Sequence, residues 1–150
     1  MVACLFSTGQ HRKATKVLAR HIIAVNPDVD RDRMNLSNLM FDKDGLLARW
    51  DLSRRKISVL PRSFSALVCT GDLYLSYNEL ESLPADFGQL QVGGSLLLND
   101  NQLDSLPEGF ENISVGRHLH LYNNQLVEQS CSFPNVRGKV NFDEYGDDDY

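Results

Sequence analysis

The sequence predicts an α/β solenoid, a short stack of parallel strands about four coils long with a helical cap at its N-terminal end. Two observations lead to this prediction. A 23-residue pattern repeats without a gap from about residue 50 onward, which is typical of repeat architectures. The residues before the repeats have instead the apolar period of an amphipathic helix.

Residues 1–49 contain no repeat, and we expect them to form a helical N-terminal capping region. A helix is predicted over residues 10–25, and Asn26-Pro27 should end it. A second, weaker helical stretch is expected over residues 28–40, followed by a turn at residues 42–45. The side chains that share the apolar stripe of the first helix are Ala14, Val17, Leu18, His21, Ile22 and Val25.

The first predicted helix has two interpretations. The first coil of a solenoid would expose apolar core without a cover, which favours a cap. The basic side chains Arg12, Lys13, Lys16 and Arg20 lie largely off the apolar stripe, so the helix could instead bind a membrane surface or a groove on a partner. We expect the cap.

Residues 50–142 contain the repeats. Leucines alternate with other residues in the segments that start at Leu73, Leu96 and Leu119, which predicts short strands with leucines on one side. Each repeat should add a strand about 4.8 Å further along a parallel sheet. An asparagine stands where the chain leaves each strand, and its amide can bond unpaired backbone groups of neighbouring coils. The members of this predicted structural ladder are Asn78, Asn101 and Asn124.

The pattern LxLxxNxLxxLPxxF, as it stands from Leu96 to Phe110, resembles the leucine-rich-repeat family. The 23-residue length and the Leu-Pro pair are similar to the intracellular subclass found in Ras-pathway scaffold proteins and in their plant and bacterial relatives. The resemblance covers residues 50–142 and implies a curved solenoid whose parallel sheet lines the concave side and binds protein. The segment Val92-Gly93-Gly94 departs from the subclass, and we expect a small second strand with a glycine turn there.

Both ends of the array are irregular, as terminal repeats usually are. Arg55 occupies the asparagine position of the first repeat. In the last repeat Gln129-Ser130 replaces Leu-Pro, and the repeat is one residue short. Residues 143–150 form an acidic tail with almost nothing to bury, and we expect it to be disordered.

The net charge of −5 is unevenly distributed. Residues 1–56 hold eleven Lys or Arg against six Asp or Glu, whereas residues 57–150 hold four against fourteen. Two such different ends could steer a partner or favour head-to-tail self-association, and a solvated surface with an acidic tail is the alternative. Because the basic residues are concentrated in the N-terminal third, no nucleic-acid partner is expected.

Composition also bears on location. No segment approaches the roughly 18 apolar residues of a membrane span, and the first residues lack the basic leader and apolar run of a secretory signal. The three cysteines, Cys4, Cys69 and Cys131, form no CxxC pair, which is typical of a reducing compartment. We therefore expect a cytoplasmic protein with no membrane partner.

The candidate binding site lies between the core leucines, where variable residues should face solvent. Tyrosines on such a rigid surface bury much area at low entropic cost, and ordinary surface polarity is the alternative. The columns are Asp51, Tyr74, Leu97 and His120; then Ser53, Ser76, Asn99 and Tyr122; then Arg54, Tyr77, Asp100 and Asn123. The predicted partner-binding residues are Tyr74, Tyr77, Leu97, Asp100, His120 and Tyr122.

Catalytic and metal-binding patterns are weak. His118 and His120 project to the same side of one predicted strand, but no third metal ligand is evident. No histidine pairs convincingly with a serine or cysteine as base and nucleophile. The sequence therefore predicts a non-enzymatic protein–protein interaction module with no catalytic residue, cofactor or metal. The alternatives are an assembly subunit that uses the basic N-terminus and the acidic C-terminal half for subunit contacts, and a module that targets an enzymatic domain encoded elsewhere.

Overall fold

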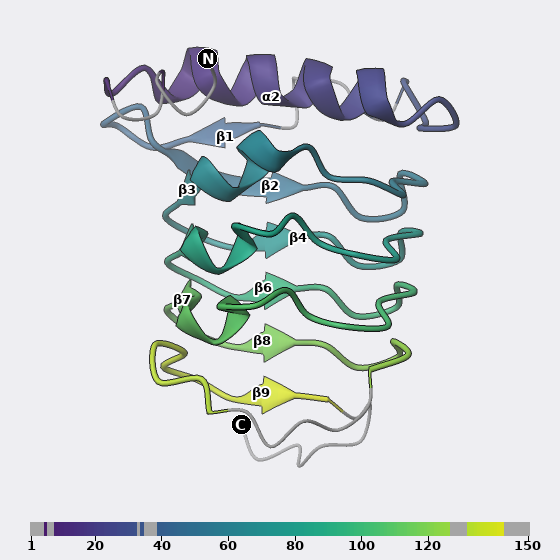
Figure 1. The fold of residues 1–150 in the computed structure, drawn as a ribbon. Helices are drawn as coiled ribbons and strands as arrows, with labels where there is room; N and C mark the ends of the chain where they lie inside the picture. Colours follow the sequence, from purple (N-terminus) through teal and green to yellow (C-terminus); the bar gives the residue numbers. More distant parts are fainter. Residues whose placement is uncertain (1–4, 6–7, 33, 35–38, 127–131, 143–150) are drawn as a thin grey trace.

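The chain folds as an α/β stack of coils in a computed structural model that describes residues 5, 8–32, 34, 39–126 and 132–142 (Figure 1). Helix α2 (His11–Val25) lies across one end of the stack. The helix predicted over residues 10–25 is thereby confirmed. The predicted acidic tail, residues 143–150, lies outside the described residues.

The described strands form one nine-stranded sheet that divides into two branches at its longest strand, β2 (Leu47–Asp51). The first branch continues through β3 (Val68–Cys69), β5 (Gln91–Val92) and β7 (Ser114–Val115). The second continues through β4 (Leu73–Tyr74), β6 (Leu96–Leu97), β8 (Leu119–His120) and β9 (Val140–Asn141). Both branches are parallel, and β1 (Met40–Phe41) pairs antiparallel with β2. The small second strand expected at Val92 is therefore confirmed.

The register of the strands follows the period of the sequence. Leu73 lies opposite Leu96, and Leu96 lies opposite Leu119. Short 3₁₀ helices return the chain to the next coil, and these are η2 (Arg62–Ala66), η3 (Phe87–Gln89) and η4 (Phe110–Asn112). Because the coils from β2 to β8 are 23 residues apart, equivalent side chains form rows along the stack. β8 and β9 pair 21 residues apart, with Leu119 opposite Val140, so the last repeat is two residues short rather than one as expected.

The core consists of such rows. Leu73 and Leu75 are fully buried on either side of the half-buried Tyr74, as strand alternation requires. An aromatic row runs behind them, with ring centroids 6.2, 6.1 and 5.9 Å apart along Trp50, Phe64, Phe87 and Phe110. Each fully buried phenylalanine stabilises the fold by roughly 1.5–3 kcal/mol relative to an exposed one.

Helix α2 packs on this core with a face that differs in part from the predicted stripe. Ala14, Leu18 and Ile22 are buried as predicted, whereas Val25 is 44% exposed. Val25 lies in the last helical turn, next to Asn26, whose buried side chain points into the stack. The Asn26 amide accepts hydrogen bonds from the Ser58 and Val59 N–H groups and donates to the Val59 carbonyl, at 2.7–2.9 Å.

The described residues between Asp28 and Arg49 do not continue the helical region as expected. The described residues from Asp28 to Met34 lie in turns or irregular backbone, so the second helix is wrong for these residues. Met40 to Asp51 form a β-hairpin instead, because Asp42 Oδ1 accepts the Asp44 and Leu46 N–H groups at 2.9 Å and closes the turn. The turn predicted at residues 42–45 is confirmed, and the sheet begins before the first predicted repeat.

The turn that joins the two branches depends on glycine. A Cβ atom at Gly116 would lie 2.0 Å from the Gly93 carbonyl oxygen in the preceding coil. A side chain at that position is therefore incompatible with the close approach of the two coils, since parallel strands stack about 4.8 Å apart.

We predict that Gly116→Ala destabilises the protein by about 2 kcal/mol, because β7 must move away from β5 to accept the methyl group. Urea unfolding followed by circular dichroism measures the change. Ser114→Ala is the control, since Ser114 is an exposed residue of the same strand. Equal stability of the two variants would contradict this account of the turn.

Candidate functional site

The surface of interest lies on the outward-facing residues of β2, β4, β6 and β8 and of the turns that follow them, and we call it the strand face. Its first row is Asp51, Tyr74, Leu97 and His120, placed opposite one another by the strand register. All four of these side chains are partly buried. The row thus consists of one aromatic, one aliphatic and two ionisable side chains on the same face of the sheet.

The second row differs from its prediction. Ser76 and Asn99, expected to face solvent, are only 5% and 2% exposed. Both are small, and the Asn99 amide donates a 2.7 Å hydrogen bond to the carboxylate of Asp100 rather than extending outward. Tyr122, in the same row, is partly exposed.

The third row lies where the chain leaves the strands. Arg54, Tyr77, Asp100 and Asn123 all have left-handed backbone conformations, with φ between 52° and 58°. Residues with a side chain usually avoid this region at a cost of roughly 1–2 kcal/mol. The recurrent turn holds these side chains at fixed positions, and Tyr77 is 49% exposed.

The asparagine amides that follow the third row hold the turns in place. Asn101 donates to the Leu75 and Leu98 carbonyls at 3.0 and 3.1 Å and accepts the Leu80 N–H group at 3.1 Å. Asn78 and Asn124 make the equivalent bonds in their own coils. Each amide therefore joins its coil to the preceding one. In the first coil Arg55 stands in this place, and its guanidinium donates to the Ser53 carbonyl at 2.8 Å.

Arginine and tyrosine side chains stack on the part of the strand face nearest to β2. The Arg49 guanidinium lies 4.7 Å from the ring centroid of Tyr74, and that of Arg54 lies 4.3 Å from the ring of Tyr77. Burial and the neighbouring Asp72 raise the pKa of Tyr74. Sequence reasoning missed Arg49, because its contact with Tyr74 joins two coils.

Histidines occupy the other part of the strand face, near β9. The ring centroids of His118 and His120 are 6.1 Å apart, and those of His120 and Tyr122 are 5.8 Å apart. The Lys139 backbone N–H donates to His118 Nδ1 at 3.0 Å, which requires that nitrogen to be unprotonated. Within the described ranges, no three His, Cys, Asp or Glu side chains gather in a way that could hold a metal ion.

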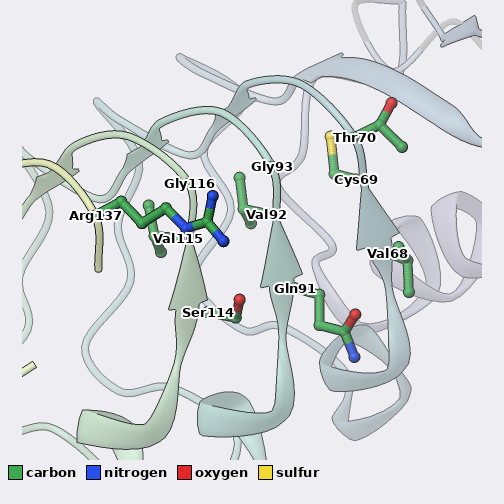
Figure 2. A pocket seen from close by; sticks show the side chains of 10 residues that line it. All are labelled: Val68, Cys69, Thr70, Gln91, Val92, Gly93, Ser114, Val115, Gly116 and Arg137. Atoms are coloured by element: carbon green, nitrogen blue, oxygen red, sulfur yellow. The ribbon is translucent and has the colours of Figure 1, made fainter. Parts of the chain in front are cut away.

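A shallow groove of about 390 Å³ lies on the first branch and was not predicted (Figure 2). Gly93 and Gly116 leave it open, and the Arg137 side chain extends across β7 toward its centre. Burial raises the pKa of the Cys69 thiol in its wall to about 11, so the thiol is protonated at neutral pH and is a poor nucleophile. The groove therefore provides a concave surface and the positive charge of Arg137, whereas the Cys69 thiol in its wall is not reactive.

Among the helices of the described residues, none has both the length and the apolar character that a bilayer crossing requires.

We predict that Asn101→Ala destabilises the protein by about 2–4 kcal/mol, because the buried Leu80 N–H and the carbonyls of Leu75 and Leu98 lose a partner. Urea unfolding measures the loss. The exposed neighbour Gln102 supplies the control, and Gln102→Ala should change stability by less than about 0.5 kcal/mol. A loss no larger than the control's would show that the amide bonds contribute little.

A pH dependence follows from His120, whose pKa is lowered by burial and by the neighbouring His118. The unfolded chain, with a pKa near 6.5, takes up this proton more readily than the folded chain. Stability should therefore fall as the pH drops below about 6.5 toward the lower folded-state pKa. Thermal unfolding between pH 7.5 and 5.5 tests this, and His120→Gln should reduce the fall, whereas His21→Gln on α2 should not. An identical fall in His120→Gln would exclude His120 as its source.

The strand face is thus a rigid surface with arginine–tyrosine stacks near β2 and a histidine–tyrosine cluster near β9. Among protein-family models, curated proteins and solved structures, none matches this chain.

Proposed function

We propose that this chain is a non-catalytic protein-binding module of the leucine-rich-repeat type, and that the strand face contacts the partner. The observation that carries the proposal is the register of large side chains on neighbouring coils, with Tyr74 and Leu97 in the first row and Tyr77 in the third. Partly exposed aromatic side chains on a fixed backbone lose little entropy on binding, which makes them effective contact residues.

The local geometry supports a preformed surface. Tyr74 donates to Asp72 Oδ2 at 3.3 Å, and its ring packs under Arg49. Asp100 accepts hydrogen bonds from the Asn99 and Asn123 amides at 2.7 and 2.9 Å. Because these side chains already occupy one position each, binding requires little further ordering.

We further propose that the solenoid has about four coils and that α2 is its N-terminal cap. The buried side chains Leu18 and Ile22 share one apolar core with Leu47 and Trp50 of β2, which supports this role. The buried free thiol of Cys69 is consistent with a cytoplasmic location for the chain.

An assembly subunit is the second candidate function. It is favoured by the contrast between the basic residues 1–56 and the acidic residues 57–150, which would attract each other between copies. Light scattering over a concentration series separates the two candidates, since an assembly subunit changes mass with concentration and a monomeric binding module does not.

We predict that a photoreactive amino acid at Leu97 or Tyr122 crosslinks a partner in extracts of the native source, whereas one at Gln91 on the first branch does not. Tyr77→Asn should lower the yield of the Tyr122 crosslink at least fivefold, because the substitution removes an exposed aromatic contact. Asparagine is the appropriate substitute, since Asn123 adopts the same left-handed conformation two coils further along the same row.

Circular dichroism of the Tyr77→Asn variant serves as the folding control for this experiment. Crosslinks of equal yield from Gln91 and Tyr122, unaffected by Tyr77→Asn, would exclude the strand face as the binding surface.

A further inference from the structure

The two arginines that stack on the strand face differ from its carboxylates in having unused hydrogen-bonding groups. Asp72 accepts the Ser95 N–H at 2.7 Å as well as the Tyr74 hydroxyl, and Asp100 accepts two asparagine amides. Among the described residues, the guanidinium groups of Arg49 and Arg54 form no side-chain hydrogen bond or ion pair, and each has a tyrosine ring as its partner. The carboxylates of this surface therefore have hydrogen-bond partners, whereas the N–H groups of the two stacked guanidinium groups have none among the described residues.

Stacking determines what these guanidinium groups can bind. A tyrosine ring covers one face of each guanidinium plane and leaves the N–H edges available. A planar fork of N–H donors matches a carboxylate or a phosphate through two parallel hydrogen bonds. The stack also restricts the long arginine side chain before a ligand arrives, which lowers the entropic cost of binding.

The spacing of the two tyrosines indicates how far apart two anionic groups should lie to reach both stacked arginines. Tyr74 and Tyr77 are three residues apart along one coil, which corresponds to roughly 10 Å of extended chain. In a peptide of polyproline II conformation, with three residues per turn and a rise of about 3.1 Å per residue, carboxylates three positions apart lie on the same side, about 9 Å apart.

The surrounding charge favours the same kind of ligand. Residues 49–56 contain Arg49, Arg54, Arg55 and Lys56 and a single acidic residue, Asp51. Asp51 already accepts the Ser53 N–H at 2.9 Å. Together with Asp72, which accepts the Tyr74 hydroxyl, this part of the strand face has four basic and two acidic side chains. This excess of positive charge attracts acidic segments and raises their association rate.

We infer that the part of the strand face nearest to β2 binds an extended acidic segment of the partner protein, with two carboxylates received by Arg49 and Arg54. This inference rests on the proposed function, because it identifies the kind of segment that the same face takes. Tyr74 and Tyr77 hold the two arginines in position and add apolar contact beside each carboxylate.

The test is fluorescence anisotropy with a labelled nine-residue probe of glycine and serine that carries two glutamates three positions apart. We expect saturable binding that weakens as NaCl is raised from 50 to 300 mM, and at least tenfold weaker binding of the same probe with glutamine in place of glutamate. Arg49→Ser and Arg54→Asn should each weaken binding about fivefold or more. Ser95 and Asn123 occupy the equivalent positions in other coils, so the backbone tolerates both substitutions.

Two further variants separate specific recognition from general charge. Arg62→Ala removes one positive charge from an exposed side chain on η2, away from the strand face, and should leave probe affinity within twofold. Arg54→Lys keeps the charge but loses the planar fork, and should weaken binding about threefold. Equal losses in Arg62→Ala and Arg54→Asn, or equal affinity for the glutamine probe, would overturn the inference.

Other occupants of the surface give different results. Concentration-dependent dimerisation that disappears in the Arg49→Ser and Arg54→Asn double variant would identify a second copy of the chain as the occupant and overturn the inference. Displacement of the probe by inorganic phosphate at concentrations where equimolar sulfate is inactive would identify a phosphate site and also overturn it. If the probe does not bind but the Tyr122 crosslink to a partner persists, the acidic-segment inference fails and the proposed function stands. Loss of the crosslink as well rejects both.

Discussion

The side-chain amides of Asn78, Asn101 and Asn124 bond the backbone at the point where each coil leaves its strand, and the rest of the stack depends on these bonds. A strand that ends next to a buried core leaves N–H and carbonyl groups without partners, which costs about 1–3 kcal/mol for each group. One amide satisfies groups in two coils at once. This gain offsets the left-handed turn in front of it and keeps successive coils at a constant separation.

The two ends of the stack differ from its middle in their hydrogen bonding and packing. At the first coil, Asn26 reaches from the end of α2 to the backbone of Ser58 and Val59, although it belongs to no repeat. At the last described coil the regular packing weakens. Phe133 meets Phe110 edge-on, at 86°, where the preceding rings are parallel. Phe133 also contacts Phe142, with ring centroids 6.2 Å apart, and the shortened last repeat places Val140 rather than Phe142 opposite Leu119.

The repeated part of the fold could be predicted from the sequence because each leucine, asparagine and phenylalanine has the same environment in every coil. The β1–β2 hairpin could not be predicted, since Met40 and Phe41 belong to no repeat and the backbone pairing of β1 with β2 leaves no periodic signal in the sequence. The burial of Ser76 and Asn99 depends on neighbouring coils rather than on strand alternation. The stack of Arg49 on Tyr74 joins residues 25 positions apart, and no local pattern indicates such a contact.

Stability and the chemistry of the exposed surface depend on different residues of each coil. The leucines and asparagines face inward and hold the backbone, whereas the first and third rows face the solvent on turns that those inward residues have already fixed. A change of side chain in the outer rows therefore alters the surface chemistry more than the fold. The third row illustrates the point, because arginine, tyrosine, aspartate and asparagine adopt one backbone conformation there. The arginine–tyrosine stacks near β2 and the histidine cluster near β9 consequently give one rigid surface two chemically different ends. Under the proposed function, a partner that lies along the stack would have to match both ends, and this requirement would be a physical source of specificity.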